Sequence, residues 1–275
     1  MGMDIGVIQG VDAEGKSLET LKNFGLNCCQ LSSWDMTKCK PDIAANVRAK
    51  AESLGVRISS LWAGLPGPAE WNFKFGPLTI GLVPAEFRMA RVQALKDWAD
   101  FAKILGAPAI VTHAGFLPEN PSDHEYLPVL SALRQVANHC KRQGIGFWFE
   151  TGQETPVTLL RYIEEIGTDN LGINLDPANL LMYGRGNPVD AARVFGKYVR
   201  SIHAKDGMLP TDGLNLGHEK AIGSGLVDFP LMLRILKDAG FDGDLIIERE
   251  IAPGEEQNRD IRNAVAKLAE WKNAL

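Results

Sequence analysis

The amino-acid sequence predicts an α/β fold, a (β/α)8 TIM barrel that forms a single domain over residues 1–275. Three observations lead to this fold class. Short apolar runs alternate with amphipathic stretches along the whole chain. A glycine repeatedly stands where a helix is expected to end. The length of 275 residues suits one closed barrel, which typically needs about 250.

Eight short apolar or β-branched runs are the candidate strands. Several are apolar at almost every position, as expected for parallel strands buried on both faces. The runs are Asp4–Gln9, Asn27–Ser32, Arg57–Trp62, Ala109–His113, Gly146–Glu150, Leu171–Asp176, Val199–His203 and Asp244–Arg249. Their alternation with helices predicts a parallel sheet, and closure into a barrel is the favoured arrangement at this length.

Eight helical stretches separate these runs, with apolar residues spaced three and four apart. They are Ser17–Phe24, Asp42–Leu54, Ala85–Leu105, Pro128–Arg142, Pro156–Ile166, Val189–Phe195, Pro230–Ala239 and Asn258–Trp271. Thr155 is the expected N-cap of the fifth, with Pro156 at its first position. The alternative is an open doubly wound sheet, but no GxGxxG follows the first strand.

Two long connections depart from the repeat, and both follow a strand. Ala63–Pro84 is rich in glycine, proline and aromatic residues, and Gly207–Val227 follows the seventh strand. Loops of this length are often lids or binding loops. We expect Trp71, Phe73 and Phe75 to cover a substrate or to pack at a subunit interface, which predicts a homodimer or homotetramer.

Charge and hydropathy exclude several classes of partner. The net charge is −5 and no basic block is present, so we expect no nucleic-acid partner. No apolar run approaches the roughly 20 residues that span a bilayer, and the start of the chain lacks a signal-peptide pattern. The four cysteines lack metal-site spacing. Together these features predict a cytoplasmic protein without a membrane partner.

The last residues of the final four strands carry the strongest functional signal. Glu150, Asp176 and His203 end strands five to seven, and Glu248 ends the run DLIIE of strand eight. Active sites of such barrels lie at this end of the strands. Any one of them has a structural alternative, since an acidic residue there often caps the next helix. All four together indicate a cation, because three converging carboxylates would otherwise repel one another.

Three carboxylates and one imidazole form a mostly hard ligand set. This predicts one divalent metal, with Mn2+ favoured and Mg2+, Co2+ or Zn2+ as alternatives. Glu150 and Glu248 come from strands five and eight, so they can reach a substrate from opposite sides. We therefore expect them to be catalytic as well, exchanging a proton beside a carbonyl through an enediolate.

Four motifs resemble the xylose-isomerase-like TIM-barrel superfamily of sugar isomerases and epimerases. The motifs are FETGQE at 149–154, NLDPAN at 174–179, IHAKD at 202–206 and IERE at 247–250. The resemblance implies a barrel with one divalent metal on the four residues named above, and a small sugar or sugar derivative as partner. In keto-sugar 3-epimerases the first and last ligand glutamates transfer the proton, which implies this role for Glu150 and Glu248.

The sequence departs from the tagatose and allulose epimerases around this set. Asn179 replaces a histidine, Leu209 replaces an arginine and Pro156 replaces a substrate-binding glutamate. The residues around the ligands therefore differ from those of these epimerases, and a free ketohexose is not favoured as substrate. Some members of the superfamily act on 3-keto-glycosides, so the expected substrate is a keto-sugar or keto-glycoside. A lyase similar to inosose dehydratases, using the same enolate, is the alternative. A non-catalytic barrel subunit is less favoured, and the three-zinc endonuclease IV would need more than the five histidines present.

The expected substrate-binding residues surround the ligands in the predicted barrel. They are His113, Trp62, Asn179, Lys205 and Gln30. Each has a structural alternative, such as a core tryptophan, a strand-end histidine or a salt bridge between Lys205 and Asp206. Asp206 is expected to orient neighbouring groups, and Glu154 and Glu250 to be surface or supporting residues.

Overall fold

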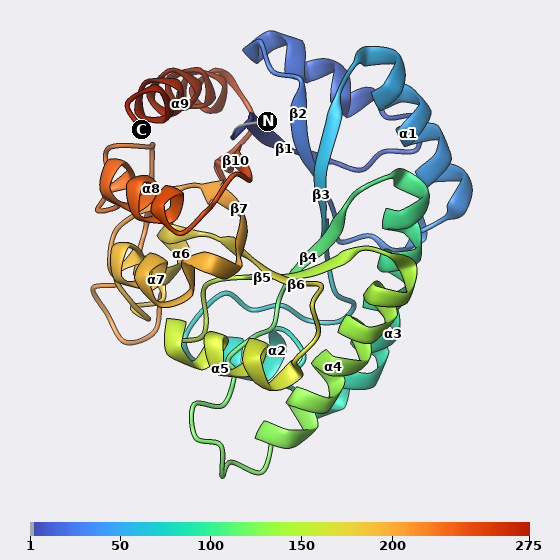
Figure 1. The fold of residues 1–275 in the computed structure, drawn as a ribbon, viewed down its shortest axis with the longest axis vertical. Helices are drawn as coiled ribbons and strands as arrows, with labels where there is room; N and C mark the ends of the chain where they lie inside the picture. Colours follow the sequence, from blue (N-terminus) through green and yellow to red (C-terminus); the bar gives the residue numbers. More distant parts are fainter. Residues whose placement is uncertain (1–2) are drawn as a thin grey trace.

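A closed barrel of eight parallel strands forms the centre of the molecule, in a computed structural model that describes residues 3–275 (Figure 1). Its strands are β1 (Ile5–Gly10), β2 (Cys28–Ser33), β3 (Arg57–Ala63), β4 (Ala109–His113), β5 (Gly146–Glu150), β6 (Leu171–Leu175), β7 (Val199–Ala204) and β10 (Asp244–Ile247). They pair in the order β1-β10-β7-β6-β5-β4-β3-β2, and β1 pairs with both β10 and β2. The predicted (β/α)8 fold class is confirmed.

Helices surround the strands on all sides in Figure 1. The α-helices are α1 (Pro41–Leu54), α2 (Gly76–Thr79), α3 (Ala85–Leu105), α4 (Tyr126–Gln143), α5 (Pro156–Ile166), α6 (Pro177–Met182), α7 (Pro188–Phe195), α8 (Phe229–Asp238) and α9 (Glu255–Asn273). Three 3-10 helices are η1 (Lys16–Phe24), η2 (Met36–Lys38) and η3 (Gly196–Tyr198). None of the helices within residues 3–275 is long and apolar enough to cross a membrane.

Capping residues end and begin the helices as the sequence predicts. Gly55 follows α1 in the left-handed conformation, and its N–H bonds to the last carbonyls of the helix. Thr155 caps α5 by accepting the Thr158 N–H, and Pro156 occupies the first position. The first predicted helix is a 3-10 helix, η1, which is a correction to the expected α-helix.

Strands β6 and β10 end earlier than expected, and this shifts two ligands into loops. Asp176 follows β6 and caps α6, a helix that the sequence analysis did not predict. Its Oδ1 accepts the Asn179 N–H at 2.8 Å, and Pro177 at the first helical position lacks an N–H for the sheet. Glu248 likewise stands one residue beyond β10.

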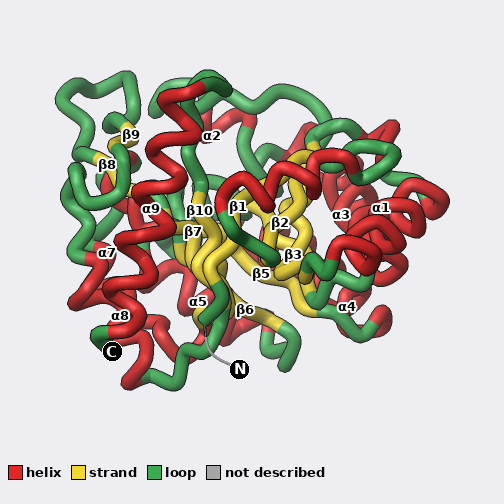
Figure 2. The backbone as a smooth tube through the Cα atoms, turned by 90° about the horizontal axis from the view of Figure 1, so that it is seen from above, coloured by secondary structure: helices red, strands yellow, loops and turns green. Residues whose placement is uncertain are grey.

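The two long connections meet across the mouth of the barrel. Residues 63–84 contain α2, and the connection after β7 contains the antiparallel ribbon of β8 (Asp206–Gly207) and β9 (Glu219–Lys220). Asn72 pairs with Asn215, and the Phe73 N–H donates to the Leu214 carbonyl at 2.9 Å. We call this contact the loop bridge. Figure 2 shows α2 and the β8–β9 ribbon at the same edge of the barrel.

Side chains of each strand point alternately to the surrounding helices and to the interior of the barrel. Along β5, Phe147 and Phe149 face the surrounding helices and are fully buried, while Trp148 and Glu150 face the interior. A Cβ on Gly172 would lie 2.6 Å from the Trp148 ring, so glycine is needed there for the indole to fit. Trp148 closes the amino-terminal end, which leaves the opposite end to polar side chains.

The four cysteines are unpaired. Cys28, Cys29 and Cys140 are buried and Cys39 is partly buried. Burial raises the pKa of the Cys29, Cys39 and Cys140 thiols to about 12, and it raises that of Cys28 as well. These groups are therefore structural side chains in the thiol form at neutral pH.

Candidate metal centre and active-site pocket

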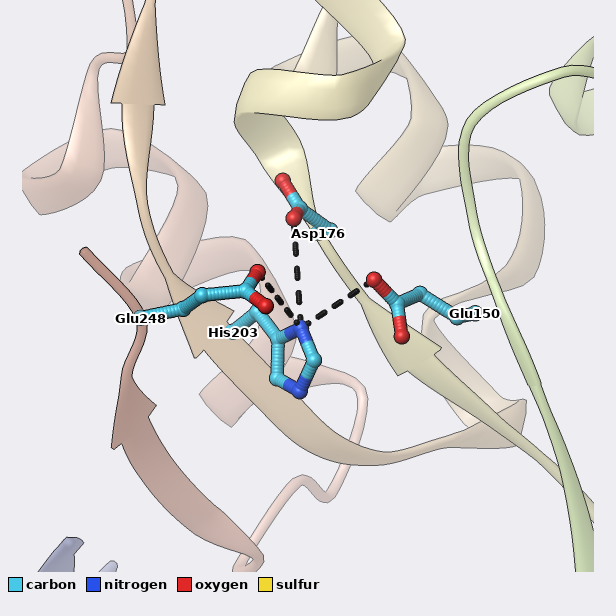
Figure 3. A group of neighbouring side chains, drawn as sticks. All are labelled: Glu150, Asp176, His203 and Glu248. Carbon is cyan, nitrogen blue, oxygen red and sulfur yellow. Dashed lines mark ion pairs between the residues drawn. The ribbon is translucent and has the colours of Figure 1, made fainter. Parts of the chain in front are cut away.

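The four predicted metal ligands converge at the carboxyl ends of the strands. Glu150, Asp176, His203 and Glu248 each offer one ligand atom, and these atoms lie within 4.8 Å of one another. Figure 3 shows the Glu150 and Glu248 carboxylates on opposite sides of the His203 ring, with Asp176 between them. All but Glu248 are buried. The arrangement is a candidate centre for one metal ion.

Distances within this group suit a divalent cation. His203 Nδ1 lies 3.2 Å from Glu150 Oε1, 3.2 Å from Glu248 Oε2 and 3.9 Å from Asp176 Oδ2. Ligands that bind an ion at about 2.1 Å and at right angles are about 3 Å apart. His203 Nδ1 and Asp176 Oδ2 are buried and have no hydrogen-bond partner among residues 3–275. A cation would satisfy both atoms.

Gln30 fixes the orientation of the His203 ring. Its Oε1 lies 2.8 Å from His203 Nε2, and its Nε2 donates to Ser60 Oγ at 2.9 Å. Because an amide oxygen only accepts, the neutral ring carries its proton on Nε2 and presents a lone pair at Nδ1. Gln30 was expected to bind substrate. In the structure both ends of its amide are engaged by His203 and Ser60, so Gln30 positions the candidate metal ligand His203.

Burial and the three carboxylates shift the pKa of each group in the cluster. Burial raises the pKa of Asp176 well above its usual value, and Lys205 offsets this only in part. Burial alone would raise the pKa of Glu150 and Glu248 too, but the cations beside them outweigh it and lower both. For His203 the two glutamates outweigh burial and raise the pKa well above its usual value. The carboxylates of the cluster thus stabilise a positive charge placed among them.

Lys205 supplies a second positive group next to the ligands. Its Nζ lies 3.1 Å from Glu248 Oε2 and 3.7 Å from Asp176 Oδ2, and it forms a close ion pair with Glu250. The ammonium is almost fully buried and lines the pocket. Glu250, which was expected to be a surface or supporting residue, lines the pocket as well as holding Lys205.

Asp206 organises the connection that follows Lys205. Its Oδ1 accepts the N–H groups of Gly207 and Val227 at 2.8 and 3.1 Å. Its Oδ2 accepts those of Gly223 and Gly225, both at 2.9 Å. The carboxylate is therefore committed to the loop backbone and makes no salt bridge with Lys205.

Glu154 is the residue whose surroundings differ most from expectation. It is only 2% exposed, and neither carboxylate oxygen has a hydrogen-bond partner within the described chain. Burial raises its pKa to about 8, which Arg185 offsets only in part. Glu154 is thus a buried acid in the β5–α5 connection rather than a surface group.

Three of the predicted substrate-binding residues contact Glu150. Trp62 Nε1 donates a short hydrogen bond to Oε2, and Asn179 Nδ2 donates to Oε1 at 3.3 Å. His113 Nε2 lies 3.4 Å from the same Oε1. Together with Lys205, these residues line a pocket of about 800 Å3 that contains Glu150 and Glu248. Trp62 was expected only as an apolar wall and is also a hydrogen-bond donor.

An aromatic corner closes the other side of the pocket. Trp34, Trp62 and Trp71 meet there, with ring centroids 4.9 Å apart for Trp34–Trp62 and 6.1 Å for Trp34–Trp71. Trp71 also packs against His113, with ring centroids 5.4 Å apart. Trp34 was missed by the sequence analysis, although it directly follows β2 and the reasoning used for the ligands would have found it. Phe73 contacts Tyr183 and does not line the pocket.

A closed eight-stranded barrel with a candidate metal cluster at the carboxyl ends of its strands is the class that the fold and the site define, and comparison with known proteins gives the family. The chain belongs to the family described as Xylose isomerase-like TIM barrel, which matches residues 18–271. The crystal structure of a xylose isomerase domain protein from Planctomyces limnophilus has a TM-score of 0.93 and 35% identity. That match covers 100% of this chain and 99% of the other.

Two further relatives are more distant. The crystal structure of a D-tagatose 3-epimerase-like protein has a TM-score of 0.75 at 22% identity, covering 99% of this chain and 98% of the other, which shows a shared fold. The uncharacterised protein MJ1311 of Methanocaldococcus jannaschii is 28% identical over 204 residues, 70% of this chain. The match spans 64% of the length of that relative.

Proposed function

We propose that this protein is a divalent-metal-dependent sugar isomerase or epimerase that acts on a keto-sugar or keto-glycoside through a cis-enediolate. One observation carries the proposal. Glu150 and Glu248 converge on one ligand cluster with their carboxylates on opposite sides of His203 (Figure 3). Family membership and the D-tagatose 3-epimerase-like neighbour support sugar chemistry.

Glu150, Asp176, His203 and Glu248 would hold the cation, with Mn2+ as the expected metal. When bound, a divalent cation polarises a carbonyl and stabilises negative charge that develops beside it. Asp176 uses one carboxylate oxygen to cap α6 and leaves the other for the cluster. Gln30 keeps the His203 lone pair directed at the same point.

Glu150 and Glu248 would exchange the substrate proton. The cationic groups around them hold both pKa values below their usual range, so both carboxylates are ionised at neutral pH. One glutamate removes the proton next to the carbonyl. The other takes up a proton from water and then delivers it to the opposite face of the carbon. Trp62 and Asn179 hold the Glu150 carboxylate in position for this transfer.

Lys205, His113 and Asn179 are the groups we propose to bind substrate oxygens. All three line the pocket, and two of them lie beside Glu150 while Lys205 lies beside Glu248. The buried Lys205 ammonium is a fixed donor in the pocket, whereas Leu209, which replaces an arginine of the tagatose epimerases, does not line it. We retain cytoplasmic location and a homodimer or homotetramer as predictions.

Deuterium exchange tests the proposal. Protein loaded with Mn2+ is incubated with keto-sugars and keto-glycosides in D2O, and label at the carbon next to the carbonyl is followed by NMR. We expect wild type to exchange, and Glu150→Gln and Glu248→Gln each to lose at least about 100-fold in rate. Glu164→Gln, on the outer face of α5, is the matched control and retains exchange. Full exchange in both pocket variants would contradict the mechanism.

The same experiment separates the epimerase from the lyase alternative. An epimerase returns labelled sugar of inverted configuration. A lyase forms the same enolate but expels a hydroxyl or the aglycone, so a dehydrated or shortened product appears in the spectrum. A non-catalytic barrel gives neither label nor product with any of these ketones.

A further inference from the structure

Two tryptophans at the mouth of the pocket are half-exposed although they are large and apolar. Trp34 is 47% exposed and Trp71 is 41% exposed, while Trp62, which contacts Glu150, is 8% exposed. Large aromatic side chains that line a pocket and remain open to solvent are typical of ligand-binding surfaces. Neither is needed to hold the metal ligands, since neither contacts them.

The three indoles form a series that leads away from the ligands. Trp62 donates to Glu150, Trp34 stacks at a tilt on Trp62 with centroids 4.9 Å apart, and Trp71 stands at 84° to Trp34. A substrate ring at Glu150 therefore has Trp62 as its neighbour. Trp34 and Trp71 are one ring further out and present two walls at nearly a right angle.

Both outer indoles pack on side chains of the pocket, Trp34 on Trp62 and Trp71 on His113. Gly64 approaches Trp34 closely, since a Cβ on Gly64 would lie 2.6 Å from the Trp34 Cα. Trp71 directly precedes Asn72, whose pairing with Asn215 forms the loop bridge. Surfaces that are already ordered lose little conformational entropy on binding, so such a corner can contribute to affinity.

The size and composition of the pocket suit a ligand larger than one sugar ring. A volume of about 800 Å3 is in the upper part of the range of roughly 300–1,000 Å3 found for small-molecule sites. Glu248, Lys205 and Glu250 cluster together through ion pairs, whereas the outer indoles contact Trp62 and His113. A pyranose or an aryl ring has an apolar face that packs on indole, and neither ring needs a charged partner.

We infer that Trp34 and Trp71 form a second subsite, which binds a cyclic aglycone joined to the sugar ring that reacts at Glu150 and Glu248. The preferred substrate is then a keto-glycoside with two rings, rather than a single keto-sugar. This inference rests on the proposed function, because the reactive ring is placed by that chemistry. The second ring is either another sugar or an aryl group.

Calorimetry on the Mn2+-loaded protein tests the subsite. The ligands are methyl glucoside, phenyl glucoside and cellobiose. Each is oxidised to a ketone at the same carbon of its glucosyl ring, which in cellobiose is the non-reducing ring. We expect wild type to bind at least one two-ring ligand roughly tenfold more tightly than the methyl form. The phenyl and cellobiose ligands distinguish an aryl aglycone from a sugar.

Variants at the corner make the test specific. Trp34→Ala is expected to bind the two-ring and methyl ligands equally, whereas Trp34→Phe, which keeps an aromatic face, retains most of the preference. Leu78→Ala is the control, because Leu78 is 64% exposed on α2 and does not line the pocket. Equal affinities in wild type, or an equal loss for all three ligands in Trp34→Ala, would overturn the subsite.

The two proposals fail in different ways. A ring preference that depends on Trp34, without deuterium exchange on any ketone, supports the subsite and overturns the proposed chemistry. Deuterium exchange on keto-sugars without any ring preference overturns the subsite alone.

Discussion

The two halves of the barrel mouth are built in different ways. The ionic half, at the ends of β5, β6, β7 and β10, places Glu150, Asp176, His203 and Glu248 at or within one residue of a strand. The aromatic half, beside β2, β3 and β4, takes Trp34 and Trp71 from connections. Barrel geometry fixes the first half, whereas loop contacts determine the second. We therefore expect chemistry in the first half and substrate choice in the second.

The largest effect on the ionic half is expected when the negative charge of a metal ligand is removed. Asp176→Asn keeps an oxygen that caps α6, since asparagine is also a good N-cap, but it removes the negative charge. We expect Mn2+ affinity to fall by more than about 100-fold, because changes outside the ligands already cost 10–100-fold. Calorimetric metal titration measures this, with thermal unfolding to check the fold. Trp34→Ala is the control and keeps its metal affinity; unchanged affinity in Asp176→Asn would argue against this metal centre.

A smaller effect is expected one layer below the ligands. Gln30→Met keeps the volume of the side chain but removes the acceptor for His203 Nε2 and the donor to Ser60. The ring loses its fixed orientation, and we expect Mn2+ affinity to fall by about 10–100-fold. The measurement is the same titration. If Gln30 binds substrate instead, metal affinity stays at the wild-type value and only ligand binding weakens.

A dependence on pH, with at most about a tenfold change in metal affinity per pH unit, should separate the two halves. In the metal-free protein Glu150 and Glu248 raise the pKa of His203, so the ring carries a proton that a cation must displace. Metal affinity therefore rises with pH, by up to about tenfold per pH unit below that raised pKa, and levels off above it. Competition with a chelator from pH 5.5 upward measures the slope. Equal metal affinity at all pH values would contradict a protonated His203.

Binding on the aromatic half should show no such slope. Trp34 and Trp71 carry no titratable group, so the ratio of affinities for two-ring and methyl ketones is expected to stay constant with pH. This ratio is a built-in control for the metal titration, because both are measured on one protein sample.

The ionic half could be predicted from the sequence because barrel topology brings strand ends together. Reading the residues at the ends of four apolar runs was sufficient to find the four residues of the candidate metal centre. The supporting contacts could not be predicted, since Gln30 and Ser60 lie on strands far from His203 in sequence. Contacts of this kind depend on which residues of neighbouring strands lie side by side, and the sequence analysis assigned the strands without their register.

The aromatic half and the loops were predicted less well, for a physical reason. Loop conformation depends on contacts between segments that are distant in sequence, such as Asn72 with Asn215. Asp206 was expected to act on its neighbours at the ligands, yet it accepts backbone N–H groups up to Val227. Glu154 was misjudged because burial of a carboxylate without a partner follows no local pattern.

The state of the cysteines makes the protein suitable for site-specific labelling. Its buried thiols are protonated at neutral pH and react slowly with alkylating probes, and the pKa of the partly buried Cys39 is also raised to about 12. A cysteine introduced at Phe75, which is 44% exposed near Trp71, would therefore react ahead of the native four. A fluorophore there would report the position of the loop bridge while ligands bind, without any change to the native cysteines.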